Sequence, residues 1–267
     1  MIAPPMCRWI AYRGAPTYLE TFVAAPAHSL IHQSLHAAEA VTGTNGDGFG
    51  VGWYADRDEP GLYRETLPAW SDENLRHLCR QIRARLFFAH VRASTGPATS
   101  RANCHPFAYG RWLFMHNGQI GSWPQMRRAV EGMIPDALYA ERTGSTDSEA
   151  LFLAAIAAGA ERNPVGAVAA TLETVARKMR AKGIAEPLRF AAALTDGRDL
   201  YAFRWASDDR PPTLYWSESE DRLLVASEPL DGSRERWALV PPDHALVARA
   251  GASVAVQRMA LRENRAA

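Results

Sequence analysis

The stretch Met6-Cys-Arg-Trp-Ile-Ala-Tyr-Arg-Gly14 places a cysteine immediately before a run rich in apolar and aromatic residues. Such a run is typical of a β-strand, and we expect one near 8–13, beginning directly after Cys7. A free cysteine is more often a buried structural group than a reactive one. The role of Cys7 therefore has to be decided from the rest of the sequence.

Alternation of apolar and polar residues predicts further strands at 49–54, 85–92, 112–116, 188–194, 199–205, 213–217, 222–227, 236–240 and 245–249. Helical patterns occur at 29–40, 72–83, 122–131, 147–160 and 164–182. The last has Asn163 as N-cap, Pro164 at its first position and Gly183 just past its end. Because the strands gather at the two ends of the chain, we expect an α+β fold rather than a parallel sheet of βαβ units.

Length and composition exclude several classes of protein. With 267 residues the chain can bury a large core, and we expect a single domain. A formal net charge of +1 gives no global field that would attract nucleic acid or an anionic membrane. Cys7, Cys79 and Cys104 contain no C-x-x-C pair, which argues against a disulfide framework or a cysteine-rich zinc site. Without a signal peptide or a long apolar stretch, the sequence predicts a soluble cytoplasmic protein.

Five segments place reactive or charge-recognising groups beside glycines or at the ends of predicted strands. They are Cys7-Arg-Trp9, Asp47-Gly-Phe-Gly-Val-Gly52, His90-Val-Arg-Ala-Ser-Thr-Gly96, Met115-His-Asn-Gly-Gln119 and Ser145-Thr-Asp-Ser-Glu149. Hydrolysis of the side-chain amide of a free amino acid needs a nucleophile, donors for an oxyanion, and partners for the α-carboxylate and the α-ammonium. The five segments supply a candidate for each, which favours a reactive role for Cys7.

In this interpretation Cys7 is the first residue of the mature chain. Its own α-amine, with an ordinary pKa of roughly 7.7–8.0, then serves as the base, so that neither a catalytic histidine nor a cofactor is needed. The Asn117 side chain and the Gly118 N–H are the candidates for the oxyanion hole. Arg92 matches an α-carboxylate, and Asp147 matches an α-ammonium.

These motifs resemble those of the class II glutamine amidotransferases, whose mature chains begin with the nucleophilic cysteine. The opening from Met6 to Gly14 is similar to the start of a stand-alone branch. That branch includes the γ-glutamyl amidohydrolase of ergothioneine synthesis and a glutathione-degrading amidotransferase subunit. The likeness extends from 7 to 149, and Ala226-Ser-Glu-Pro-Leu230 with the stretch 237–242 also fits the stand-alone branch.

The resemblance implies both a fold and a set of roles. The fold is a four-layer αββα sandwich of two antiparallel sheets, that of the N-terminal-nucleophile hydrolases. The implied roles are nucleophile for Cys7, glutamine clamps for Arg92 and Asp147, oxyanion hole for Asn117 with Gly118, and a contact with the substrate carboxylate for Thr95.

Three features depart from the family pattern. Cys7 is not residue 2, so we expect either that translation starts at Met6 or that residues 1–6 are removed, leaving 7–267 as one glutamine amidotransferase domain. Ala93 stands where several relatives carry a bulky aromatic residue. No ammonia-accepting synthase domain follows, so ammonia transfer would need a separate partner protein.

The sequence leaves three functions open. The first is hydrolysis of the γ-amide of glutamine, or of a small γ-glutamyl conjugate, through a γ-glutamyl thioester on Cys7. The second is a glutaminase subunit that delivers ammonia to a separate synthase. The third is a non-enzymatic protein that binds glutamyl compounds while residues 1–6 block Cys7.

Other polar motifs have simpler explanations. His28, His32 and His36 recur every four residues, but no acidic ligand lies in register, and we expect no metal. His90 and His116 are interpreted as groups that orient loops and satisfy backbone groups.

Two more motifs are assigned structural roles. The run 46–52 lacks the βαβ unit of a dinucleotide fingerprint, so its glycines are interpreted as letting a strand approach the nucleophile closely. Cys104 and His105 are adjacent, and adjacent side chains of an extended chain point to opposite faces. They therefore make a poor protease pair.

Overall fold

A computed structural model describes residues 7–35, 45–93, 99–208, 210–231 and 233–261. Within them the strands form two antiparallel sheets. The larger sheet has the order β11 (Ala238–Leu239), β9 (Tyr215–Ser219), β10 (Arg222–Ala226), β1 (Arg8–Tyr18), β4 (Arg83–Val91), β2 (Phe49–Tyr54) and β3 (Gly61–Glu65). The smaller sheet has the order β13 (Ala255–Arg258), β12 (His244–Ala248), β8 (Leu200–Ala206), β7 (Arg189–Thr195), β6 (Trp112–Gln119) and β5 (Phe107–Tyr109).

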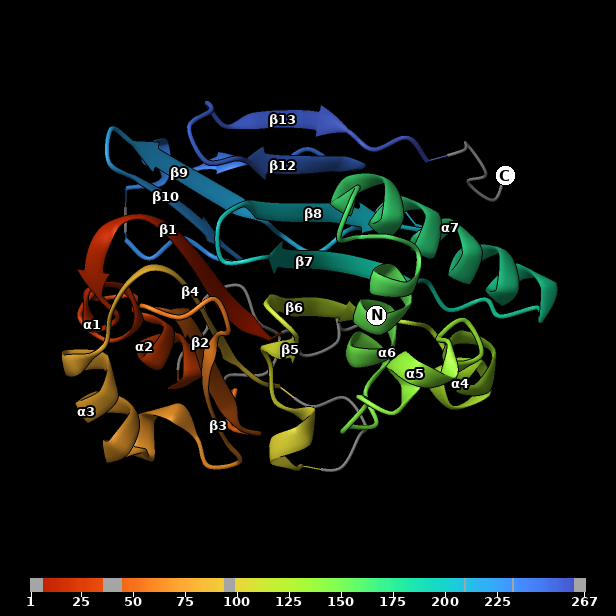
Figure 1. The fold of residues 1–267 in the computed structure, drawn as a ribbon, viewed down its shortest axis with the longest axis horizontal. Helices are drawn as coiled ribbons and strands as arrows, with labels where there is room; N and C mark the ends of the chain where they lie inside the picture. Colours follow the sequence, from red (N-terminus) through yellow and green to blue (C-terminus); the bar gives the residue numbers. More distant parts are fainter. Residues whose placement is uncertain (1–6, 36–44, 94–98, 209, 232, 262–267) are drawn as a thin grey trace.

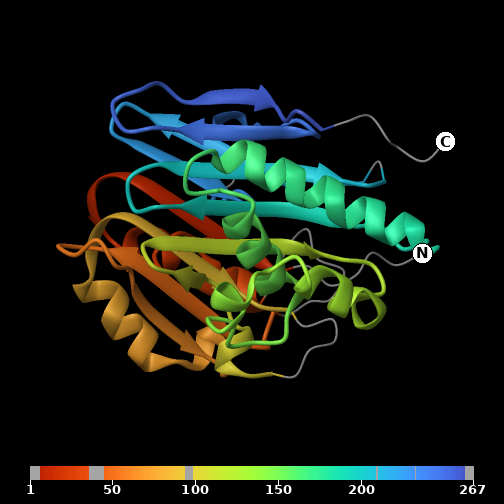
Figure 2. The same cartoon turned by 45° about the vertical axis from the view of Figure 1, so that its right-hand side comes forward.

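Helices cover the outer face of each sheet, so the molecule has four layers (Figures 1 and 2). The larger sheet is covered by α1 (Glu20–Val23), α2 (Leu30–Leu35) and α3 (Glu73–Gln81). Packed on the smaller sheet are α4 (Trp123–Glu131), α5 (Asp136–Tyr139), α6 (Asp147–Ala157) and α7 (Pro164–Ala181). The expected αββα sandwich is therefore confirmed.

The alternation of β1 explains how one strand serves two cores. Ile10 and Tyr12 point outward into the core beneath α1–α3, whereas Trp9 and Ala11 point into the core between the two sheets. All four side chains are buried. Because the first five residues of β1 are buried on both faces, the sequence there reads as a continuous apolar run directly after Cys7 and Arg8.

Each strand predicted from the sequence overlaps an observed strand, although 236–240 shrinks to the two residues of β11. The caps predicted for α7 are also present, since Asn163 Oδ1 accepts from Gly166 N at 3.1 Å and Gly183 has a φ of +67°. The helix predicted at 29–40 is described only as far as Leu35 in α2, and 36–40 lie outside the described residues.

The strands and α-helices of the described residues that the sequence analysis missed are β3, β5, β13, α1 and α5. β5, α1 and α5 have only three or four residues, too few to show a period. β13 is exposed along its whole length, so nothing in its burial requires apolar residues to alternate with polar ones. Every residue of β3 is only half-buried, so its sequence shows no clear alternation either.

Two glycines of β2 allow a neighbouring segment to pack directly on the larger sheet. A Cβ on Gly50 would lie 2.2 Å from the His105 carbonyl oxygen, and one on Gly52 would lie 2.8 Å from Pro106 Cγ. The sequence interpretation was right that these glycines permit a close approach. It was wrong about the partner, which is the segment 104–106 rather than the nucleophile.

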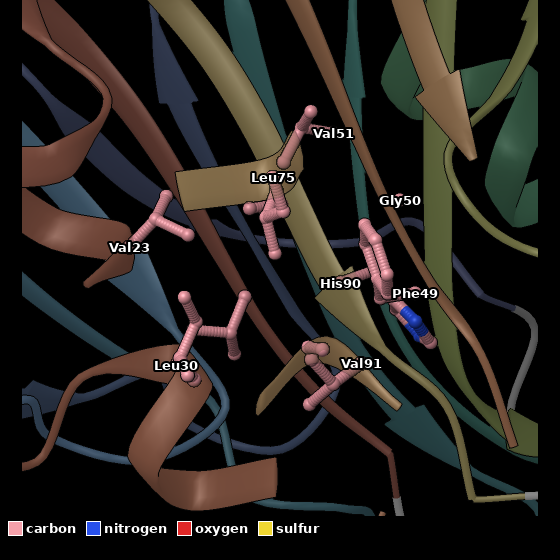
Figure 3. A pocket seen from close by; sticks show the side chains of 11 residues that line it. Val23, Leu30, Phe49, Gly50, Val51, Leu75, His90 and Val91 are labelled. Carbon is pink, nitrogen blue, oxygen red and sulfur yellow. The ribbon is translucent and has the colours of Figure 1, made fainter. Parts of the chain in front are cut away.

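A small apolar pocket lies on the outer face of the larger sheet (Figure 3). Val23, Leu30 and Leu75 from the three helices surround it, together with Val51 and Val91 from β2 and β4. Its lining includes none of the site residues predicted from the sequence. The pocket is therefore a packing gap of the outer core and not a candidate substrate site.

Among the described residues, no helix combines the length and the apolar character that crossing a membrane requires.

The close contact at Gly50 generates a prediction for stability. Gly50→Ala should lower the free energy of unfolding by about 1–3 kcal/mol, because the added methyl group must displace the 104–106 backbone. Urea unfolding followed by circular dichroism measures the change. Gly132→Ala is the matched control, since Gly132 is exposed and has a φ of −67°. A Cβ there would lie 3.2 Å from the nearest atom, the Arg128 carbonyl oxygen. A Gly50→Ala protein as stable as the control would contradict this account.

Candidate active site

Cys7 stands at the start of β1, the central strand of the larger sheet, and the chain beyond β4 holds its thiol. Ala93 donates its N–H to Cys7 Sγ at 3.3 Å. Burial raises the pKa of the Cys7 thiol, although the Ala93 hydrogen bond and the charges of Arg92 and Arg8 each lower it in part. The thiol is therefore protonated at neutral pH and needs a base before it can attack.

Asn117, near the end of β6, reaches the same corner from the smaller sheet. Its buried side chain donates from Nδ2 to the Cys7 carbonyl oxygen at 3.0 Å. A side-chain amide carries a second N–H, so Asn117 keeps a donor for an oxyanion while it holds Cys7. The contact joins the two sheets at the predicted nucleophile.

Gly118 follows in a backbone conformation that favours glycine. Its φ is +148°, and a Cβ there would lie 1.9 Å from the Arg189 carbonyl oxygen. The residue is exposed, whereas Asn117 beside it is buried. The two predicted oxyanion donors are thus adjacent, and a side chain at Gly118 would force β6 and β7 apart.

Arg92 is buried and is held by the two residues just before β2. Its N–H donates to the Gly48 carbonyl oxygen at 2.8 Å, and its Nη1 donates to the Asp47 carbonyl oxygen at 3.3 Å. Asp47 in turn donates its N–H to the Arg92 carbonyl oxygen at 3.1 Å. These contacts keep the guanidinium close enough to Cys7 to lower the pKa of the thiol.

Asp147 is the first residue of α6, and its carboxylate faces the chain just past Gly118. Oδ2 accepts from Ile120 N at 2.8 Å, and Oδ1 accepts from Ser148 N at 2.8 Å. Ser148 Oγ also donates to Oδ1, at 3.4 Å. Oδ2 keeps a further lone pair, so the carboxylate can still accept from an ammonium group. The structure therefore places Asp147 at the same end of β6 as Asn117.

The loop before Asp147 is fixed by two buried side chains that the sequence analysis did not single out. Glu149 accepts from Thr143 N at 2.9 Å and from Gly144 N at 2.8 Å, and Asn103 Oδ1 accepts from Ser145 N at 2.8 Å. The spacing Thr146-x-x-Glu149 is that of a capping box and could have indicated this role. Glu149 reaches back to the loop instead of to the N-cap residue.

His116 connects α6 to β7, and its contact with a backbone carbonyl fits the interpretation from the sequence that it satisfies a backbone group. Its Nδ1 lies 2.9 Å from Ser148 Oγ, and its Nε2 lies 3.2 Å from the Arg189 carbonyl oxygen. Burial lowers the pKa of His116, so the ring is neutral at pH 7. It therefore serves as a hydrogen-bonding link between Ser148, next to Asp147, and β7.

A buried ion pair beside Cys7 was also missed. Arg8 donates from Nε to Glu228 Oε2 at 2.8 Å, and both side chains are buried. The only signal in the sequence was a charged residue among apolar neighbours in each of the two segments. That signal could not reveal that two residues 220 positions apart meet.

Cys104 and His105 do not form a nucleophile and base pair. Cys104 Sγ lies 3.4 Å from the carbonyl oxygens of Glu65 and Ser100, and burial raises the pKa of this thiol to about 11. The His105 ring stacks on His90 instead, with 4.2 Å between the ring centroids.

Two residues singled out from the sequence lie outside the part of the chain that the structure describes. Thr95 and His36 are not among the described residues. His28 and His32 meet edge to face, with 5.5 Å between their ring centroids. The part of the chain that the structure describes contains no group of three His, Cys, Asp or Glu side chains that could hold a metal ion.

Comparison with known proteins finds a family model and two relatives that agree with one another. Residues 22–210 match the family model described as class-II glutamine amidotransferases. The chain is 33% identical to the probable glutamine amidotransferase DUG3 of Saccharomyces cerevisiae, covering 90% of this chain and 81% of that protein. It is also 29% identical to the γ-glutamyl-hercynylcysteine sulfoxide hydrolase of Mycolicibacterium smegmatis. That match covers 90% of this chain and 94% of the hydrolase.

Solved structures agree with these relatives. A glutamine aminotransferase class-II domain protein from Silicibacter pomeroyi superposes with a TM-score of 0.76 at 38% identity, covering 95% of this chain and all of that one. A glutamine phosphoribosylpyrophosphate amidotransferase from B. subtilis, at 14% identity and a TM-score of 0.62, shares the fold over 96% of this chain and 50% of that one.

The environment of the thiol generates a prediction for its reactivity. In the full chain, where the Cys7 nitrogen is an amide, the pH midpoint for alkylation of Cys7 by iodoacetamide should lie above that of free cysteine, because burial raises the pKa. Arg92→Gln should move the midpoint to still higher pH, since the arginine charge lowers that pKa. Peptide mass spectrometry across a pH series measures both midpoints.

Arg85→Gln provides the control, because Arg85 is an exposed arginine of β4, the strand that ends just before Arg92. It should leave the Cys7 midpoint unchanged. An Arg92→Gln protein whose midpoint stays at or falls below the wild-type value would contradict this account of the site.

Proposed function

We propose, since this chain belongs to the class II glutamine amidotransferase family, that it hydrolyses the γ-amide of glutamine or of a small γ-glutamyl conjugate, with Cys7 as the nucleophile. The active form begins at Cys7, so that this residue carries a free α-amine. The contact that most supports the proposal is the hydrogen bond between Asn117 and the Cys7 carbonyl. It brings the candidate oxyanion donor and the candidate nucleophile to one point from different sheets.

In the first step the α-amine of Cys7 takes the thiol proton, directly or through one water, and the sulfur attacks the γ-carbonyl carbon of the substrate. The carbonyl π-electrons move to oxygen, and the second N–H of Asn117 with the Gly118 N–H stabilises that oxyanion. When the tetrahedral intermediate collapses, the C–N bond breaks. The α-ammonium then returns its proton to the departing ammonia or amine.

In the second step water hydrolyses the γ-glutamyl thioester. The α-amine removes a proton from the water, the hydroxyl adds to the thioester carbonyl, and the C–S bond breaks. Sulfur recovers the proton, and glutamate leaves. The reaction consumes one water and uses no redox equivalent, so this chemistry requires no cofactor.

Arg92 and Asp147 would select a substrate with an amino-acid end. A guanidinium forms paired hydrogen bonds with a carboxylate, and the Asp147 carboxylate at the start of α6 can accept from an ammonium. Thr95 is proposed to contact the same substrate carboxylate. The substrate in the printed name of the Mycolicibacterium smegmatis relative carries a γ-glutamyl group, which supports this substrate class.

A second candidate is that the chain supplies ammonia to a separate synthase. The yeast relative is named a probable glutamine amidotransferase, which favours this possibility. The two candidates differ in how the isolated protein behaves. Full hydrolysis of a γ-glutamyl substrate without any partner supports the hydrolase, whereas stimulation of glutamine hydrolysis by an added synthase supports the subunit.

Labelling by a glutamine analogue tests the proposed nucleophile. A protein beginning at Cys7, incubated with the diazo-ketone analogue 6-diazo-5-oxo-norleucine, should gain one adduct. The thiol proton passes to the diazo carbon next to the ketone, and the sulfur then displaces N₂ from that carbon. Peptide mass spectrometry should place the adduct on Cys7. Glutamine in excess should protect the protein from labelling.

The other two cysteines are internal controls, because burial raises the pKa of Cys79 to about 12 and that of Cys104 to about 11. An adduct on either of them, or no adduct on the Cys7-started protein, would defeat the proposal.

A second test addresses the ammonium clamp. Asp147→Asn should raise KM for glutamine by about 10- to 100-fold, the effect of losing a charged hydrogen bond of roughly 1.5–3 kcal/mol. It should leave KM for glutaramate, the analogue without an α-amino group, nearly unchanged. Steady-state kinetics with both substrates measures the difference.

Asp136→Asn is the matched control, because Asp136 is an exposed aspartate at the first position of another helix. If Asp147→Asn raised KM equally for glutamine and for glutaramate, Asp147 would not bind the α-ammonium group.

A further inference from the structure

Arg8 is one of the most deeply buried charged residues in the described chain, with a relative exposure of 0%. It follows Cys7 directly and lies at the first position of β1. A guanidinium stays protonated at neutral pH, and burying it is costly unless its donors are satisfied. The contacts of this side chain therefore indicate why a charge is kept at this position.

Glu228 is the ion-pair partner, and it comes from the far end of the chain. Arg8 Nε donates to Glu228 Oε2 at 2.8 Å. Ser227, the residue before it, accepts at Oγ from Trp9 N at 3.0 Å and donates its own N–H to the Trp9 carbonyl oxygen at 3.1 Å. These bonds extend the pairing of β10 with β1 toward the nucleophile, which fixes Glu228 opposite Arg8.

The other end of the guanidinium reaches the nucleophilic residue itself. Arg8 Nη1 donates to the Cys7 carbonyl oxygen at 3.1 Å. Asn117 Nδ2 donates to the same oxygen at 3.0 Å from β6 of the smaller sheet. The Cys7 carbonyl is therefore held from both sheets at once.

We propose that Arg8 and Glu228 are positioning residues for the nucleophile: Glu228 holds the guanidinium, and the guanidinium holds the Cys7 carbonyl. The proposal rests on the proposed function, in which Cys7 is the first residue of the active chain. A terminal residue has no preceding peptide bond to restrain it and frays unless other contacts hold it. Sulfur and α-amine must nevertheless keep one geometry toward the substrate.

A role in stability alone would not require this arrangement. Buried ion pairs contribute little net stability, and an apolar pair of similar volume often replaces them without loss. The planar guanidinium donates through Nε to Glu228 and through Nη1 to Cys7 at the same time. A lysine has a single nitrogen on a flexible stem and cannot reproduce both directions. The geometry therefore uses a property that only arginine has.

Kinetics of proteins beginning at Cys7 provide the test. Arg8→Lys and Glu228→Gln should each lower kcat for glutamine by about 10- to 100-fold, since small displacements of a reacting group cost factors of this size. KM should change by less than about 2-fold, because in this proposal neither residue contacts the substrate. The double variant should lose no more than the worse single variant, because both changes release the same carbonyl.

Arg204→Lys is the matched control. Arg204 is also buried and donates to backbone carbonyl oxygens, from Nε to Pro212 at 2.8 Å and from Nη1 to Val240 at 2.9 Å. Its replacement should lower the thermal midpoint of unfolding without changing kcat. An Arg8→Lys protein that folds and keeps the wild-type kcat, or loses activity only through KM, would overturn the proposal.

An activity-independent measurement separates this proposal from the proposed function. With cysteine labelled at Cβ with carbon-13, NMR relaxation reports the order of Cys7, and the buried Cys79 and Cys104 serve as internal references. Cys7 should be as ordered as the references in the wild type and more mobile in Arg8→Lys. Equal order of Cys7 in both proteins would overturn the positioning role. A wild-type protein that shows ordered Cys7 but no hydrolysis would defeat the proposed function alone.

Discussion

The close approach of the two sheets at one end is the constraint on which the site depends. Asn117 of β6 in the smaller sheet donates to the carbonyl of Cys7, the residue just before β1 of the larger sheet. The core between the two sheets combines large side chains such as Trp9 with small ones such as Ala11 and Ala193. A close approach also occurs at β2, where Gly50 leaves room for the backbone at His105.

This packing produces a thiol that is positioned but not activated. Burial raises the pKa of Cys7, and the neighbouring arginine charges only partly oppose that effect. The described histidines near the motifs are committed elsewhere: His116 bonds to Ser148, and His90 stacks on His105. Burial also lowers the pKa of His90 to about 3, which leaves it a poor proton acceptor near pH 7. An α-amine on Cys7 itself would supply the missing base.

The sequence was sufficient for the features that depend on local patterns. Alternation along β1 and the caps of α7 reflect neighbouring residues, and the motif around Asn117 identified a residue that does lie beside Cys7. Contacts between residues far apart in the sequence could not be predicted from local patterns. Nothing near Arg8 indicates that Glu228 is its partner. The loop held by Glu149 and Asn103 likewise depends on residues 46 positions apart.

The account claims that one residue supplies both the sulfur and the proton acceptor. The most direct test compares glutamine hydrolysis by the chain that begins at Cys7 with hydrolysis by the chain that begins at Met1, in which the same sulfur is present but its nitrogen is an amide. The account predicts turnover by the first and a rate lower by at least about 100-fold in the second, the usual contribution of a general base. Equal turnover by the two proteins, with the Met1 form shown intact by mass spectrometry, would contradict it.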